Sequence, residues 1–152
     1  VSEVQKVLEI CKTVREELQA EQIPYAEKIE LGIMIETPAA AIISDQLAPM
    51  VDFFSVGTND LTQYTLACDR QNPDIESFCD THHEAILRLI AWSAKNAHEH
   101  GAWIGICGEL AADTSLTEQF LRMGIDELSV SPTFVLKVRD AVRKVDLHAK
   151  ED

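Results

Sequence analysis

The chain has 152 residues, of which 46% are hydrophobic and 26% are charged, a composition typical of one globular domain. The formal net charge of −13 makes nucleic acid an improbable ligand, because an acidic surface repels phosphate backbones. The sequence contains no apolar run long enough to span a bilayer and no basic-then-apolar leader, so we expect no membrane association. The chain opens at Val1 without an initiator methionine, which suggests a piece of a longer protein.

The four cysteines show no paired spacing that would indicate a metal site or a disulfide framework. They are Cys11, Cys68, Cys79 and Cys107, and no C-x-x-C motif occurs. We therefore expect free thiols, which are typical of the reducing cytoplasm.

The first part of the chain predicts a helix, a strand and a second helix. Residues 2–21 carry apolar side chains at steps of three and four, which form one helical stripe, and Pro24 ends this segment. Residues 31–35 are a short, continuous apolar run that ends at Glu36, which predicts a strand buried on both faces. Thr37 and Pro38 then open a helix that we expect to run to about residue 47.

The same alternation continues to the C-terminus. A second apolar run at 51–56 predicts a strand, and a longer polar excursion follows over 61–81. Helices are predicted over 83–100, 115–123 and 134–145, with strands at 103–107 and 128–130 between them. The charged tail 148–152 is expected to fray.

A helix followed by four β-α units indicates the α/β class with a parallel sheet, either doubly wound or in a barrel. A complete eight-unit barrel usually needs about 250 residues. Four strands cannot close such a barrel, so the open edges would need a cover.

Polar side chains are concentrated where the predicted strands end. Glu36 follows the first strand, Asn59 and Asp60 follow the second, and Ser131 follows the fourth. Cys107 and Glu109 lie at the end of the third strand. Active sites of parallel barrels are built at this end. The same residue types also follow strands because they make turns, so the pattern alone leaves both interpretations open.

The residue types at these ends fit the binding of a phosphate and a hard cation. The carboxylates of Glu36 and Asp60 suit Mg²⁺, which takes one or two carboxylates together with substrate oxygens and waters. Arg70 could clamp a phosphate through its guanidinium group, or pair with the neighbouring Asp69. Cys107 could act as a general acid or a nucleophile, or could simply be a small buried hydrophobe.

Three motifs in order resemble those of the phosphoenolpyruvate-utilising enzymes. They are Gly32-Ile-Met-Ile-Glu-Thr-Pro-Ala-Ala-Ala41, Ser55-Val-Gly-Thr-Asn-Asp-Leu-Thr-Gln63 and Gly105-Ile-Cys-Gly-Glu-Leu110. The continuation Tyr64-Thr-Leu-Ala-Cys-Asp-Arg70 is most similar to enzyme I of the bacterial sugar phosphotransferase system. The resemblance implies that residues 1–152 are the C-terminal half of a (β/α)8 TIM-type barrel, and that the phosphohistidine and phosphocarrier-binding domains lie outside this chain.

The resemblance also implies a role for each matching residue. Glu36 and Asp60 match the Mg²⁺ ligands, and Asn59, Asp60 and Arg70 match substrate-binding positions. Cys107 matches the cysteine that protonates the enolate as pyruvate forms. The implied reaction transfers the phosphoryl group of phosphoenolpyruvate to a histidine and then to the phosphocarrier protein HPr. A homodimer is implied as well.

Two alternatives remain beside enzyme I. One is a fragment of pyruvate phosphate dikinase or phosphoenolpyruvate synthase, enzymes of the same family. The other is a non-catalytic dimerisation module, because exposed strand edges favour self-association.

Overall fold

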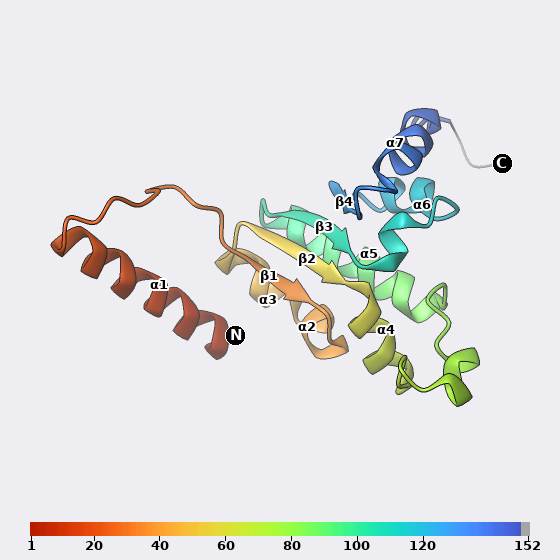
Figure 1. The fold of residues 1–152 in the computed structure, drawn as a ribbon, viewed down its shortest axis with the longest axis horizontal. Helices are drawn as coiled ribbons and strands as arrows, with labels where there is room; N and C mark the ends of the chain where they lie inside the picture. The colour runs from red at the N-terminus through yellow and green to blue at the C-terminus, as the bar shows by residue number, and fades with distance from the viewer. Residues whose placement is uncertain (150–152) are drawn as a thin grey trace.

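The structure is a computed structural model, which describes residues 1–149 (Figure 1). The chain begins with a helix and continues with strands that alternate with helical segments. The strands are β1 (Gly32–Ile35), β2 (Phe53–Gly57), β3 (Trp103–Cys107) and β4 (Glu127–Ser129). The α-helices are α1 (Ser2–Ala20), α2 (Pro38–Ile42), α3 (Ser44–Leu47), α4 (Thr58–Leu66), α5 (Glu84–Glu99), α6 (Thr117–Arg122) and α7 (Val135–Lys144), with 3-10 turns η1 (Ala48–Met50), η2 (Pro73–Phe78) and η3 (Glu109–Ala112).

The strands form one parallel four-stranded sheet in the order β1-β2-β3-β4. Each strand therefore pairs with the next one along the chain, and the helical connections carry the backbone from one strand to its neighbour. The α/β class and the parallel sheet predicted from the sequence are confirmed.

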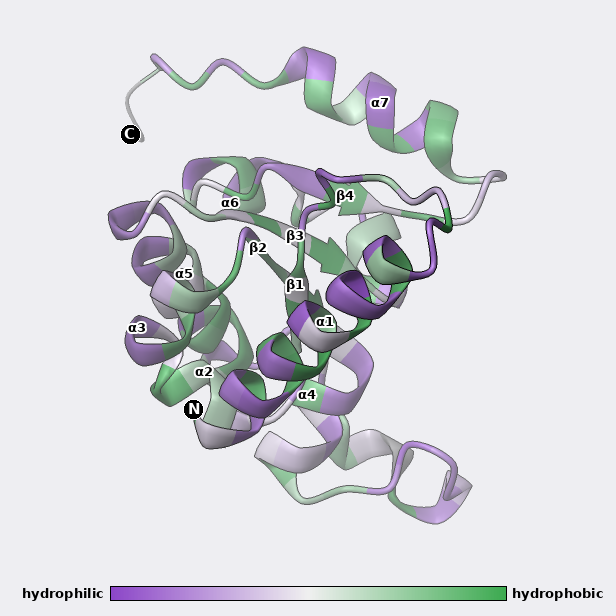
Figure 2. Ribbon diagram, turned by 90° about the vertical axis from the view of Figure 1, so that its left-hand side faces the viewer, coloured by the Kyte–Doolittle hydropathy of each residue, from purple (hydrophilic) through white to green (hydrophobic). Residues whose placement is uncertain are grey.

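One face of the sheet, here called the covered face, holds the hydrophobic core. Alternate strand residues point to this face, and α5 runs behind β2 and β3 in Figure 1. Figure 2 shows the strands as hydrophobic segments beside helices of mixed polarity. The fully buried strand residues of the covered face are Ile35, Phe54, Val56, Ile104 and Ile106.

The other face, here called the open face, is less enclosed. Met34 of β1 is 44% exposed, and Phe53 stacks on Trp103 with ring centroids 4.4 Å apart. The Phe53 ring also lies over Gly32, where a Cβ atom would come within 2.3 Å of it. The prediction that β1 is buried on both faces is therefore wrong. Within residues 1–149, the helices that pack on the sheet leave Gly32 and Met34 of its edge strand exposed.

Three predicted boundaries also differ from the structure. The polar excursion expected at 61–81 begins with helix α4, because Thr58, Leu61 and Thr62 form a buried stripe at helical spacing. The single helix expected to run to residue 47 is broken at Ile43 into α2 and α3. Helix α6 begins at Thr117, since Asp113 accepts hydrogen bonds from the backbone N–H and hydroxyl of Ser115 and so forms a turn first.

Helix α1 differs from α5 in how little of it is buried. It forms where predicted, but none of its residues is buried, and Val7, Ile10 and Val14 are all more than 40% exposed. A long segment joins α1 to β1 and leaves the helix apart from the sheet (Figure 1). Half-buried Val4 packs against the core.

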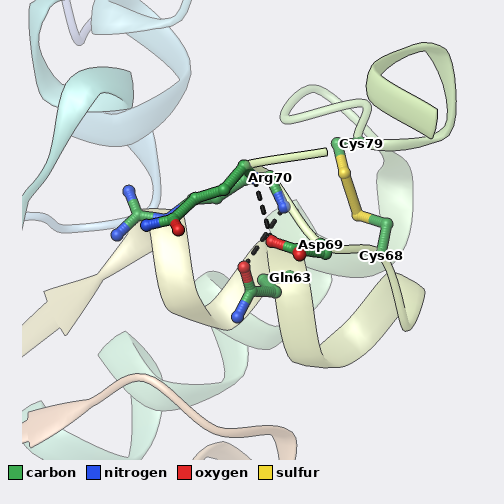
Figure 3. Close-up of a disulfide and its surroundings, with 6 residues drawn as sticks. Gln63, Cys68, Asp69, Arg70 and Cys79 are labelled. Carbon is green, nitrogen blue, oxygen red and sulfur yellow. Dashed lines mark hydrogen bonds between the residues drawn. A yellow bond between two sulfur atoms is a disulfide. The ribbon is translucent and has the colours of Figure 1, made fainter. Parts of the chain in front are cut away.

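Two of the cysteines expected as free thiols are joined. Cys68 and Cys79 form a disulfide with Cα atoms 5.9 Å apart (Figure 3). Cys11 and Cys107 are free. The expectation failed because the fold, not the sequence spacing, brings Cys68, two residues after α4, to Cys79, just after η2.

Candidate functional site

The carboxyl ends of β1, β2 and β3 meet at one edge of the sheet, and the candidate residues lie there. Parallel pairing sets Ile35 beside Val56, and Gly57 beside Cys107. Glu36 therefore follows β1 at the level where β2 ends, and Cys107 is the last residue of β3. Asn59 and Asp60 occupy the first turn of α4 rather than the turn before it.

Gly108 allows the end of β3 to approach α4 closely. Its φ of +109° favours glycine, and a Cβ atom would lie 2.6 Å from the hydroxyl oxygen of Thr58. With the glycine in place, the Thr58 hydroxyl donates to the carbonyl of Cys107 at 3.3 Å. The backbone N–H of Glu109 donates to Oδ1 of Asn59 at 3.3 Å. These bonds fix Asn59 against the loop that follows Cys107.

Gly57 makes room for the side chain of Glu36. A Cβ atom at Gly57 would come within 3.0 Å of Oε2 of Glu36, a closer approach than side chains tolerate easily. The Glu36 carboxylate is thus held against the end of β2 and stays half-buried.

Asp60 and Arg70 form an ion pair across the N-terminal turn of α4 and the loop after it. Nη2 of Arg70 is 3.7 Å from Oδ1 of Asp60, and both side chains are partly exposed. Arg70 thus reaches Asp60, although the sequence left a pair with Asp69 open. The backbone N–H of Arg70 donates to Oε1 of Gln63 at 3.2 Å, which ties the loop to α4 (Figure 3).

Cys107 is a free, half-buried thiol on the open face of the sheet. The hydroxyl of Ser55, on neighbouring β2, lies 3.4 Å from Sγ of Cys107 and can donate to it. A thiol held in this way, partly accessible and fixed in direction, is suited to transfer a proton to a bound molecule.

Two cavities open at this edge and share two residues. The first, of about 400 Å³, is lined by Asn59, Thr62, Gln63, Arg70, Gln71, Cys79, Thr81 and Glu109. The second, of about 560 Å³, is lined by Asn59, Gly108, Glu109, Ala112, Ser129, Val130, Ser131 and Phe134. Asn59 and Glu109 thus stand between the two. Among the described residues that line the first cavity, Arg70 is the cation and Glu109 the carboxylate, so an anionic ligand there would bind on the Arg70 side.

Glu36 and Asp60 follow the neighbouring strands β1 and β2 and offer carboxylate oxygens, the donor type that Mg²⁺ prefers. Residues 1–149 contain no group of three or more His, Cys, Asp or Glu side chains placed to hold a metal ion. Two carboxylate donors suit an ion that completes its shell with substrate oxygens and waters. The room left by Gly57 for the Glu36 carboxylate is consistent with such a ligand.

The loop between α4 and α5 is tied to the loop after η3 by a hydrogen bond. Nε2 of His82 lies 2.7 Å from Oδ2 of Asp113. Hydrogen bonds from Ser115, with a smaller contribution from His82, lower the pKa of the Asp113 carboxyl below its ordinary value.

Sequence reasoning missed the residues that hold the candidates in place. Gln63, Ser55 and Thr58 contact Arg70, Cys107 and the Cys107 carbonyl respectively. Ser55 and Gln63 are the ends of the motif that contains Asn59 and Asp60, which was the one signal available. Ser131, the predicted candidate from the fourth strand, lines the second cavity with Asn59.

Comparisons with known proteins agree on one family. Residues 1–147 match the model of the family described as PEP-utilising enzyme, PEP-binding domain.

In the part of the chain that the structure describes, no helix has the length and apolar character needed to cross a membrane.

Several curated relatives share one name. The chain is 45% identical to a phosphoenolpyruvate-protein phosphotransferase of Lactococcus lactis subsp. cremoris over 152 residues, which is all of this chain and 26% of the relative. A protein of that name from Streptococcus equinus is 46% identical over 129 residues, which is 85% of this chain and 22% of the relative. Another from Priestia megaterium is 43% identical over 145 residues, which is 95% of this chain and 25% of the relative. The chain thus spans about a quarter of the length of these relatives.

Proposed function

The chain belongs to the family of phosphoenolpyruvate-utilising enzymes and corresponds to their PEP-binding domain, and from this premise we propose that it is the phosphoenolpyruvate-binding region of a phosphoenolpyruvate-protein phosphotransferase. The observation that carries the proposal is that the motif residues lie together at one edge of the sheet. They lie beside a cavity that is lined in part by Arg70. The name shared by the relatives supports phosphoenolpyruvate as donor and a protein as acceptor.

In this proposal each residue at the edge has one task. Glu36 and Asp60 hold Mg²⁺, which when bound would offset negative charge on the phosphoryl and carboxylate groups of the substrate. Arg70 binds the phosphate through its guanidinium group, and Asn59 donates its amide N–H to a substrate oxygen. The Oδ1 atom of Asn59 already accepts from the Glu109 backbone, so its Nδ2 group is the one oriented for this purpose.

Cys107 supplies the proton that completes the reaction. When the phosphoryl group leaves phosphoenolpyruvate for a histidine, the remaining enolate carries negative charge and needs a proton on its methylene carbon. The thiol of Cys107 gives this proton and pyruvate forms, while the Ser55 hydroxyl at 3.4 Å stabilises the thiolate left behind. The open face of the sheet keeps the thiol accessible to such a ligand.

The proposal includes the rest of the parent protein. Residues 1–152 would be the C-terminal half of a (β/α)8 barrel, a half supported by the sequential strand order β1-β2-β3-β4 and by the sparse cover of the open face. The phosphohistidine domain would lie elsewhere in the full-length protein, with HPr as the acceptor.

A cytoplasmic location is proposed because phosphoenolpyruvate is a cytoplasmic metabolite. A homodimer is proposed because apolar residues such as Ile10 and Leu136 are exposed.

Intact-mass spectrometry of the full-length protein tests this function. The protein is incubated with phosphoenolpyruvate and Mg²⁺ without nucleotide, beside an Asp60→Asn variant. We expect one added phosphoryl group on the wild type, transferable to HPr, and none on the variant. An Asp45→Asn variant is a matched control, because Asp45 lies on α3 away from the site residues and the substitution removes the same charge.

Other outcomes separate the alternatives. A phosphoryl group that appears only with nucleotide or pyrophosphate partners would indicate a dikinase or synthase. No modification under any condition would contradict the proposal and favour a dimerisation module.

A further inference from the structure

The Cys68–Cys79 disulfide encloses the loop that carries Arg70. Cys68 lies two residues after the end of α4, Arg70 comes two residues later, and Cys79 lies just after η2. Figure 3 shows Arg70 beside the disulfide with its side chain extending away from it. The disulfide therefore sets the path of the backbone on which the candidate phosphate ligand is mounted.

The loop depends on this disulfide because its other ties are few. Oxygen atoms of Asp69 and Asn72 accept hydrogen bonds from backbone N–H groups that are only two or three positions further along the chain. At the start of the loop, the backbone N–H groups of Cys68 and Arg70 both donate to Gln63 of α4, and Arg70 makes a partly exposed ion pair with Asp60. Phe78 of η2 is 70% exposed, so the loop has little core of its own.

The two sulfur atoms differ in access. Cys68 is 4% exposed, whereas Cys79 is half-buried and lines the first cavity. A reductant that enters the cavity thus reaches Cys79 first. Because the attacked sulfur must be accessible, reduction has a defined direction here.

We propose that Cys68 and Cys79 are a reversible thiol-oxidation site that controls phosphoenolpyruvate binding through the position of Arg70. This inference rests on the proposed function and its cytoplasmic location. Disulfides in cytoplasmic proteins are usually transient and redox-sensing, because the compartment keeps thiols reduced. Because Cys68 and Cys79 lie on either side of Arg70 in the sequence, their oxidation state can change the position of this substrate-binding residue.

The chemistry is thiol–disulfide exchange with a dithiol reductant. A thiolate of the reductant attacks Sγ of Cys79, and Sγ of Cys68 leaves with the bonding electrons and takes up a proton. The second thiol of the reductant then attacks the mixed disulfide, releases the Cys79 thiol and forms the disulfide of the reductant. Two electrons and two protons pass to the protein, and an oxidised dithiol or glutathione disulfide reverses the exchange.

The oxidised state holds Arg70 beside Asp60 in the first cavity, and the reduced state frees the loop. Opening the ring restores conformational freedom that the ligand must then remove when it binds. We expect the KM for phosphoenolpyruvate to rise about three- to tenfold on reduction, with a smaller change in kcat, because a misplaced positioning group weakens binding first.

The test uses the full-length protein in two redox states. It is equilibrated with oxidised glutathione or with dithiothreitol, its free thiols are alkylated, and the peptides are mapped by mass. The KM for phosphoenolpyruvate is measured in both states, together with the rate of tryptic cleavage after Arg70. A Cys68→Ser/Cys79→Ser variant should show the reduced-state KM and cleavage rate under both conditions. A Cys11→Ser variant, which changes a free cysteine of α1, should respond as the wild type does.

The expected result is a Cys68–Cys79 cross-linked peptide after oxidation, a higher KM after reduction and its reversal on reoxidation. No cross-link after oxidation, or the same KM in both states, would overturn the proposal. If phosphoenolpyruvate is not used in either state, the proposed function has failed, and the rate of cleavage after Arg70 decides the redox site alone. Faster cleavage after reduction would then support a redox-controlled loop, and equal rates would overturn it.

Discussion

The two faces of the sheet are made by the same strands but differ in burial and in the types of side chain that they carry. The covered face holds fully buried aliphatic and aromatic side chains such as Phe54 and Ile106. The open face carries Ser55 and Cys107, which contact each other, and leaves Met34 exposed. Successive residues of a strand point to opposite faces. A residue that packs in the core is therefore followed directly by one that faces the proposed site.

The difference explains why candidate site residues can be polar and accessible without unfolding the domain. Cys107 follows Ile106 directly, yet the first is half-buried on the open face and the second is fully buried. Close packing on the covered face fixes the strand, and the strand fixes the direction of the thiol. Substitutions on the two faces should consequently have effects of different kinds.

The largest expected effect comes from Phe54, with its neighbour Phe53 as the matched control. Phe54→Ala removes a fully buried ring from the covered face and should lower the free energy of unfolding by about 3–5 kcal/mol. Phe53→Ala removes a half-buried ring that stacks on Trp103, and should cost about 1–2 kcal/mol. Urea unfolding of the 152-residue chain, followed by circular dichroism, measures both values. Equal losses would contradict the distinction between the faces.

The second effect is chemical and belongs to the open face. Cys107→Ala should slow pyruvate formation by about 100-fold or more, since it removes the proposed proton donor. Phosphorylation of the histidine by phosphoenolpyruvate should be affected far less, because that step precedes protonation of the enolate. Rapid-quench measurement of phosphohistidine and of pyruvate, with Cys11→Ala as control, separates the two steps. If both slow by the same factor, Cys107 does not act as the proton donor.

Much of the covered face could be predicted from the sequence, and the open face less well. The periodicity of 83–100 predicts that Ile86, Leu89, Ile90, Ala94 and Ala97 face inward. Four of these residues of α5 are buried, and Leu89 is half-buried and packs against the core. The continuous apolar run at 31–35 led to a strand buried on both faces, because a run of apolar residues carries no information on what covers each side. Likewise the stripe of α1 predicted the helix but not its exposure, which depends on partners that lie far away in sequence.

The motifs predicted where the candidate residues lie, but not the contacts that hold these residues in place. The positions of Glu36, Asn59, Asp60 and Cys107 at strand ends could be predicted, because parallel strands end at the same edge. The Cys68–Cys79 disulfide could not, since its formation depends on the path of the loop after α4 rather than on residue spacing. The helix that begins at Thr58 had a signal in its buried stripe, but it was hidden by the polar residues between.

The smallest expected effect lies in the loop after η3, in the pH dependence of Asp113. Hydrogen bonds from Ser115 and His82 lower the pKa of this carboxyl below 3.8, so its stabilising contribution is present above that pH and is lost as the pH falls through the lowered pKa. Asp113→Asn should therefore reduce the free energy of unfolding by about 0.5 kcal/mol at pH 7, because the group is partly exposed, and by nothing measurable once the wild-type carboxyl is protonated. Asp45→Asn, at an exposed position of α3, removes the same charge from the chain of −13 and corrects for the change in net charge. Urea unfolding of the three chains between pH 2.5 and pH 7, a range chosen around the ordinary Asp value, gives the difference directly. A difference between Asp113→Asn and wild type that stays constant over this range would mean that the carboxyl acts through its shape alone.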